Sequence, residues 1–136
     1  MDREAALEFI RHHHHAVLAT VRSDGEPQLS PVAAGVDDDG FVVVSTRETA
    51  VKTKNLSRRP RASLVPLSDG FFGEWTQVEG PVEIVHLPDA MEGLISYYRQ
   101  LSGEHPDWDE YRAAMVNDGR IALILRPERA YGMVAG

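Results

Sequence analysis

Short apolar runs rich in valine, leucine and isoleucine alternate along the chain with turns built from glycine, proline, aspartate and asparagine. Such runs are typical of β-strands, and they predict six strands, at residues 16–21, 28–36, 41–45, 62–65, 75–85 and 121–125. Apolar residues at helical spacing, next to capping residues or prolines, predict four helices, at residues 2–11, 49–58, 88–103 and 106–116.

The order of these elements favours a small barrel over a parallel sheet. The first three strands follow one another closely, joined by turns at Ser23–Glu26 and Asp37–Gly40, as in an antiparallel meander. Helices inserted among short strands then predict a mainly β (α+β) fold, a six-stranded antiparallel barrel with peripheral helices. No repeat or linker divides residues 1–136, so we expect a single domain.

Composition and charge exclude several classes of protein. The formal net charge is −7, from 14 basic and 21 acidic residues, which argues against a general binder of nucleic acid or of anionic membranes. The absence of cysteine excludes thiol catalysis and fits a cytoplasmic location. No apolar run approaches the ~20 residues of a membrane span, and the N-terminus is too polar for a secretory signal.

The common catalytic and metal-binding motifs are also missing. Four consecutive histidines, His12 to His15, cannot easily converge on one ion because neighbouring side chains point in different directions, so we expect a helix-to-strand junction and no metal site. The sequence contains no Gly-x-Ser-x-Gly motif, no Gly-x-Gly-x-x-Gly fingerprint and no Walker loop. An enzyme with this sequence would therefore take its chemistry from a bound cofactor.

One basic segment runs against the acidic character of the chain. Between Arg47 and Arg61 there is one acidic residue, Glu48, and six basic ones: Arg47, Lys52, Lys54, Arg58, Arg59 and Arg61. Cations at the beginning of a helix are unfavourable unless an anion binds there, and Ser45, Thr46 and Thr49 would add hydroxyl donors. The residues alone leave two interpretations open, a solvated helix face and a phosphate site.

Several segments, taken in order, resemble the pyridoxamine 5′-phosphate oxidase-like split-barrel superfamily. Residues 16–32 (AVLATVRSDGEPQLSPV) resemble its opening hairpin, and residues 45–56 (STRETAVKTKNL) with 58–62 resemble its phosphate-gripping strand and helix. Residues 75–80 (WTQVEG) are similar to its next long strand. Residues 103–112 (GEHPDWDEYR), with Met115 and Val116, resemble the actinobacterial branch that uses the deazaflavin coenzyme F420.

The resemblance implies an FMN-binding split barrel that forms a homodimer, with two cofactor sites at the interface. Ala50 stands where related deazaflavin proteins often have an arginine, and Arg47 is the candidate to replace it. Lys54, Arg58 and Arg59 would guide the acidic polyglutamyl tail of the deazaflavin. The implied cofactor-binding residues are Lys52, Asn55, Ser45, Thr46 and Thr53 for the phosphate and ribityl chain, Gln28, Ser30 and Val32 for the ring system, and Trp75 as an aromatic wall from the same or the partner subunit.

The activity that the resemblance implies is an F420H2-dependent oxidoreductase, which transfers hydride to an electron-poor small molecule such as an enone or quinone. Two alternatives stay open: an FMN-dependent reductase or oxidase on the same fold, and a non-catalytic carrier of F420, flavin or haem. The Arg-Leu-x-Pro ending of true pyridoxamine 5′-phosphate oxidases is absent, so that activity is not expected. The sequence identifies no proton donor; Tyr131, His86 and His105 are the candidates.

Overall fold

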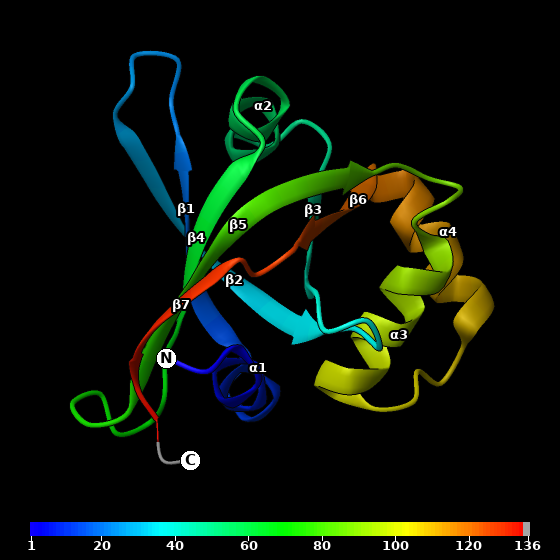
Figure 1. The fold of residues 1–136 in the computed structure, drawn as a ribbon. Helices are drawn as coiled ribbons and strands as arrows, with labels where there is room; N and C mark the ends of the chain where they lie inside the picture. Colours follow the sequence, from blue (N-terminus) through cyan, green and yellow to red (C-terminus); the bar gives the residue numbers. More distant parts are fainter. Residues whose placement is uncertain (135–136) are drawn as a thin grey trace.

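The computed structural model describes residues 1–134, which form four helices and seven strands (Figure 1). Their order is α1 (Arg3–His12), β1 (His15–Val21), β2 (Pro27–Val36), β3 (Val42–Arg47), α2 (Val51–Arg58), β4 (Arg61–Pro66), β5 (Trp75–Val85), α3 (Met91–Ser102), α4 (Trp108–Asp118), β6 (Arg120–Leu125) and β7 (Arg129–Met133). All ten predicted elements are confirmed, with bounds that shift by a few residues. None of the helices in residues 1–134 has the length and apolar character needed to cross a bilayer.

The strands close into an antiparallel barrel, as predicted. Neighbours pair in the order β4–β1–β2–β3–β6–β5, and β4 also pairs with β5, which closes the ring of six. The additional strand β7 pairs along the first half of β5. Sequence patterning missed β7 because Ala130 is the one buried residue among its five, so the segment shows little alternation of apolar and polar positions.

β2 and β3 diverge from each other and give the barrel its split. They pair over three residues of each strand, from Ala34 opposite Val44 to Val36 opposite Val42. The first seven residues of β2 pair with β1, whereas β3 continues beside β6 until Arg47 lies opposite Arg120. Helix α2 follows β3 and packs against β1 and β5 at this end of the barrel (Figure 1).

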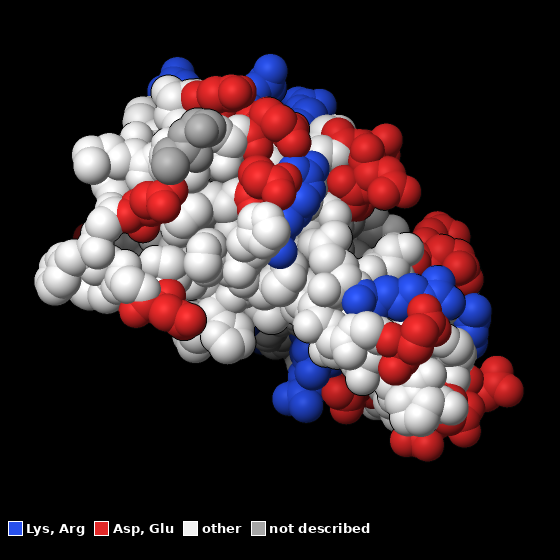
Figure 2. All heavy atoms as spheres, turned by 90° about the horizontal axis from the view of Figure 1, so that it is seen from below, with Lys and Arg blue, Asp and Glu red and all other residues white. Residues whose placement is uncertain are grey.

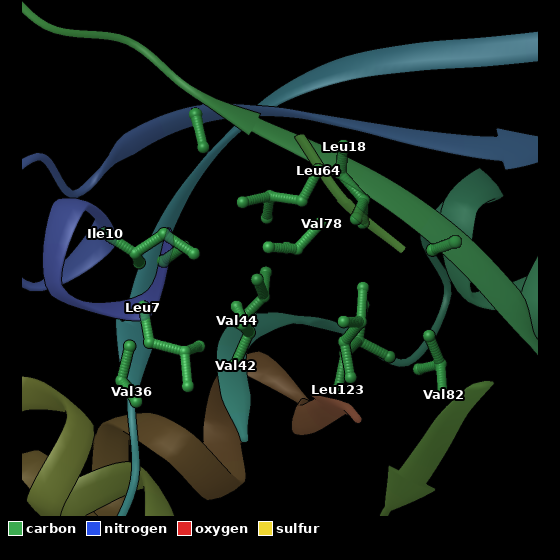
Figure 3. Packing of buried hydrophobic residues seen from close by; sticks show 14 of the residues in the cluster. Leu7, Ile10, Leu18, Val36, Val42, Val44, Leu64, Val78, Val82 and Leu123 are labelled. Atoms are coloured by element: carbon green, nitrogen blue, oxygen red, sulfur yellow. The ribbon is translucent and has the colours of Figure 1, made fainter. Parts of the chain in front are cut away.

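The barrel interior is filled by the inward-facing residues of its strands and closed at one end by α1. Alternation along β1 and β5 buries every second side chain, as expected for strands with one face in a core. Figure 3 shows these side chains meeting in the interior. They include Leu18 from β1, Val42 and Val44 from β3, Leu64 from β4, Val78 from β5, Leu123 from β6, and Leu7 and Ile10 from α1.

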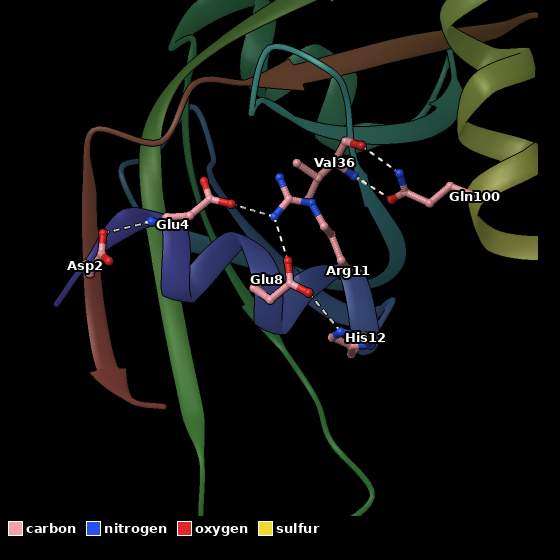
Figure 4. Close-up of polar contacts among 7 residues, drawn as sticks. All are labelled: Asp2, Glu4, Glu8, Arg11, His12, Val36 and Gln100. Carbon is pink, nitrogen blue, oxygen red and sulfur yellow. Dashed lines mark hydrogen bonds and ion pairs between the residues drawn. The ribbon is translucent and has the colours of Figure 1, made fainter. Parts of the chain in front are cut away.

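Helix α1 ends at the histidine run, and β1 begins within it, so the predicted helix-to-strand junction is confirmed. Asp2 caps the helix by accepting the Glu4 backbone N–H at 3.1 Å (Figure 4). Arg11 and His12 hold the pKa of the Glu8 carboxyl below its ordinary value through side-chain hydrogen bonds of 2.9 Å each. Among residues 1–134, no three His, Asp or Glu side chains are arranged to hold a metal ion.

Helices α3 and α4 form a second, smaller core over the outer face of β6. Tyr111 of α4 is buried against Leu94 of α3 and donates its hydroxyl to the Leu94 carbonyl oxygen at 2.9 Å. Burial raises the pKa of Tyr111 to about 12. On the barrel side, the Gln100 amide both donates to and accepts from the Val36 backbone at 2.7 Å (Figure 4). The helical pair is therefore anchored to the end of β2.

Candidate functional site

The connection between β3 and α2 leaves the beginning of α2 without a side-chain cap. Ala50 occupies the N-cap position, makes no side-chain hydrogen bond, and is followed by no acidic residue in the first turn. The turn is held in place from within, because the Thr53 hydroxyl donates to the Arg47 carbonyl oxygen at 2.8 Å. The positive end of the helix dipole thus lacks the capping oxygen that most helices have.

Three cations gather beside this turn: Arg47, Lys52 and Arg120, which we call the basic cluster. Register places Arg47 of β3 directly opposite Arg120 of β6. Asp118 Oδ2 lies 3.3 Å from Arg120 Nε and 3.7 Å from Arg47 Nη2. Lys52 is half-buried. Its pKa is lowered mainly by this burial and to a smaller extent by the Arg120 charge. Among residues 1–134, Lys52 has no ion-pair partner.

Arg120 and Tyr97 are candidate site residues that sequence analysis missed. Tyr97 donates its hydroxyl to the Ala33 carbonyl oxygen of β2 at 2.8 Å. Burial raises the pKa of Tyr97, while the Ser45 backbone N–H of β3 and the Arg120 charge partly oppose that rise. Tyr97 therefore spans the split between β2 and β3. Neither residue has a motif of its own, because strand register and helix docking alone bring them to the site.

The consecutive site candidates on β3 do not share one face. Thr46 lies opposite Ile121, is 6% exposed and faces the barrel interior. Ser45 and Arg47 are on the other face of the strand, as the two-residue period of a strand requires. A direct role for Thr46 in binding a cofactor on the same side as Arg47 is therefore disfavoured, and Ser45 and Arg47 remain together.

The three ring-lining candidates on β2 share the inward face of that strand. Their partners in β1 are core-facing residues, Leu18 opposite Ser30 among them. Ser30 Oγ is buried and has no hydrogen-bond partner among residues 1–134. A buried hydroxyl without a partner is costly, so this atom fits a site where a ligand supplies a polar group. The set consists of Gln28, Ser30 and Val32.

The buried side chains of α2 are engaged within the chain. Asn55 is 3% exposed; its Nδ2 donates to Thr20 Oγ1 at 3.1 Å, and its Oδ1 accepts from Arg58 Nη2 at 2.7 Å. Thr20 in turn donates to Gln28 Oε1 at 3.3 Å. Thr53 is also buried and uses its hydroxyl internally. The structure thus gives Asn55 and Thr53 positioning contacts, and direct contact with a cofactor stays a prediction for both.

Trp75 lies away from these residues within one chain. It begins β5 and pairs with Met133 of β7, at the end of the barrel opposite α2 (Figure 1). It is 44% exposed, and the neighbouring β4–β5 loop exposes Phe71 and Phe72 still further. On the side where Figure 1 places this loop, Figure 2 shows a largely uncharged area that is interrupted by acidic but not by basic side chains.

Two cavities of the single chain lie beside other elements. One of about 370 Å³ lies between the Asp37–Asp39 turn and α3, and another of about 550 Å³ lies beside α1. Tyr97 lines the first cavity, whereas Lys52, Arg120 and Ser30 line neither.

The proton-donor candidates are held in contacts of their own. Tyr131 donates to Glu79 Oε1 at 3.3 Å on the outer face of the barrel. His105 packs among the aromatic rings of α3 and α4, and its Nδ1 accepts the Asp107 backbone N–H at 2.9 Å. His86, just after β5, is exposed, and its Nδ1 lies 3.8 Å from Oε1 of Glu48, the residue that follows Arg47. These contacts bring His86 beside the turn of the basic cluster and give Tyr131 and His105 no link to it.

Comparison with known proteins identifies the family. The model of the pyridoxamine 5′-phosphate oxidase family matches residues 2–133. Among solved structures, the conserved hypothetical protein Rv2991 of Mycobacterium tuberculosis superposes with a TM-score of 0.81 at 23% identity, over 98% of this chain and 85% of that one.

Two further neighbours show the same fold with different functions. An F420 reductase has a TM-score of 0.68 at 22% identity, over 91% of this chain and 94% of that one. HutZ, the haem storage protein of Vibrio cholerae, has a TM-score of 0.72 at 18% identity, over 97% and 95%. The resemblance seen in the sequence is confirmed: this chain belongs to the pyridoxamine 5′-phosphate oxidase family and has its split-barrel fold.

Proposed function

We propose that this protein is an F420H2-dependent oxidoreductase that reduces electron-poor small molecules such as enones or quinones. The observation that carries the proposal is the basic cluster at the uncapped beginning of α2, where Lys52 is half-buried without an ion-pair partner among residues 1–134. Burying an unpaired cation beside another cation is unfavourable. A bound phosphate would remove that cost, and F420 and FMN both carry one.

The residues around the split suit a phosphorylated flavin-type cofactor. Lys52, Arg47 and the free N–H groups of α2 would hold the phosphate. The inward face of β2 would support the ring, and the unpartnered Ser30 hydroxyl would hydrogen-bond to one of its polar atoms. When bound, a reduced deazaflavin supplies a hydride. The chain's part is to fix the ring and exclude water from it.

Reduction of an acceptor tests this function against a carrier role. Purified protein mixed with F420H2 and a panel of enones, quinones and nitro compounds is expected to oxidise F420H2 at a rate that depends on the acceptor and the protein. Absorbance of the oxidised deazaflavin measures the rate. Tight F420 binding with no turnover across the panel would instead establish a carrier, and a protein that is purified yellow with bound flavin would favour the FMN-dependent alternative.

We further propose that two copies form a homodimer in which Trp75 of one contributes to the cofactor site of the other. The position of Trp75, at the opposite end of the barrel from α2, supports this arrangement. The exposed apolar side chains beside it, Phe71, Phe72 and Met133, would be covered by the second copy.

Mixed dimers test the shared site. Trp75→Ala and Lys52→Glu homodimers are each expected to bind F420 weakly. A heterodimer of the two variants would combine Lys52 of one chain with Trp75 of the other, so one site in two is expected to recover wild-type affinity, as measured by fluorescence titration. If Trp75 instead served the site of its own chain, both sites of the heterodimer would stay defective.

A further inference from the structure

The two arginines of the basic cluster repel each other, and one nearby carboxylate offsets only part of this repulsion. Arg47 and Arg120 lie directly opposite each other across β3 and β6, and like charges at such positions repel. Asp118, at the end of α4, is the carboxylate within ion-pairing distance of both arginines. Oε1 of Glu48, the acidic residue of the turn between β3 and α2, lies 3.8 Å from His86 Nδ1. Two arginines therefore share one carboxylate.

The contacts of Arg120 fix one part of its guanidinium and leave the other part available. Its Nε donates to Asp118 Oδ2 at 3.3 Å, and its side chain is 29% exposed. Among residues 1–134, the two Nη groups make no hydrogen bond. An arginine anchored through Nε presents its terminal N–H groups as a fork that matches two phosphate oxygens.

Arg120 lies close to Lys52 and to the split between β2 and β3. Its charge acts on Lys52 of α2 and on Tyr97, whose hydroxyl reaches Ala33 beside the split. Arg120 begins a strand whose next residue, Ile121, is fixed in the core, so its backbone is held by the barrel itself. The arrangement has the rigidity expected of a binding residue carried on a strand.

We propose that Arg120, positioned by Asp118, is a phosphate-binding residue that acts together with Lys52. This inference rests on the proposed function, because it extends the phosphate site of the bound cofactor to β6. In the complex, Lys52 supplies a point charge and Arg120 supplies directional hydrogen bonds through its Nη groups. The phosphate relieves the repulsion among the three cations, so binding also stabilises the folded chain.

The test compares FMN with riboflavin, which differ in the phosphate alone, and measures F420 beside them. Arg120→Gln is expected to weaken binding of F420 and FMN by about tenfold or more while leaving binding of riboflavin, which lacks the phosphate, unchanged. Arg120→Lys keeps the charge without the fork and should recover part of the loss. The matched control is Arg112→Gln, since Arg112 is an exposed arginine of α4 that pairs with Glu92 at 3.3 Å.

A second readout needs no cofactor. Removing the Arg120 charge should raise the pKa of Lys52 towards its ordinary value, which pH-dependent amine labelling measures. If Arg120→Gln does not fold, Arg120→Lys keeps the charge that Asp118 pairs with, and its phosphate-dependent affinity should still fall severalfold because the directional fork is lost.

The outcomes separate this inference from the function it extends. Wild-type discrimination between FMN and riboflavin that survives in Arg120→Gln would overturn the role of Arg120 and leave the cofactor site intact. Equal loss of riboflavin and FMN binding in that variant would show a structural role and also overturn the inference. A wild-type protein that binds neither F420 nor FMN would contradict the proposed function itself.

Discussion

Replacing Lys52 with glutamate is expected to abolish cofactor binding while the barrel stays folded. A carboxylate at this position would repel the phosphate instead of attracting it, so we expect affinity for F420 to fall by about a hundredfold or more. The folded state should lose nothing, because the lowered pKa of Lys52 shows that its charge is disfavoured there by burial and by Arg120. A glutamate beside Arg120 would exchange repulsion for attraction.

Fluorescence titration and thermal unfolding of the same preparations measure the two parts of this prediction. Arg112→Glu is the matched control, because Arg112 is an exposed cation of α4 outside the basic cluster and undergoes the same reversal of charge. The control should retain most of its affinity. A Lys52→Glu protein that is unfolded without ligand would show that Lys52 is needed for structure and would remove the main support for the phosphate site.

Replacing Gly80 with alanine is expected to cause a large loss of stability. A Cβ at this position of β5 would lie 1.9 Å from the Arg126 carbonyl oxygen and 3.1 Å from the Glu128 backbone nitrogen. Because these atoms belong to the backbone, the strand or the β6–β7 connection must move. We expect the free energy of unfolding to fall by about 3 kcal/mol or more.

Urea unfolding measures this loss, and the chain offers a clean control. Gly93 lies in α3, and a Cβ there would meet no atom within 4 Å. Gly93→Ala should therefore be neutral or should stabilise the protein by about 0.5–1 kcal/mol. Similar stability of the two variants would mean that the β6–β7 connection yields easily at Gly80.

The sequence pattern predicted the barrel well because its strands have one clear core face. The run from Phe41 to Ser45 and the alternation in residues 75–85 leave little choice of structure. Gly80 and Pro81 lie where β5 changes partners from β4 to β6. β7 was missed because it gains its structure from pairing with β5, and its own residues carry little strand signal.

Only the part of the candidate site whose residues are close together in the sequence could be predicted. Charge and hydroxyl donors marked the turn into α2, since Arg47 and Lys52 are close in sequence. Arg120 and Tyr97 come to the site through strand register and helix docking, which leave no local trace in the sequence. Strand alternation and helix burial also place the side chains of Thr46 and Thr53 away from solvent, which the local sequence does not reveal.

The basic cluster beside the split is proposed to hold the phosphate of a redox cofactor. Titration of the wild-type protein with the deazaflavin riboside and with its 5′-phosphate, which differ in the phosphate alone, tests this most directly. We predict saturable binding of the 5′-phosphate and at least about tenfold weaker binding of the riboside. Equal affinity for the two compounds, or binding of neither F420 nor FMN, would contradict a phosphate site at the basic cluster.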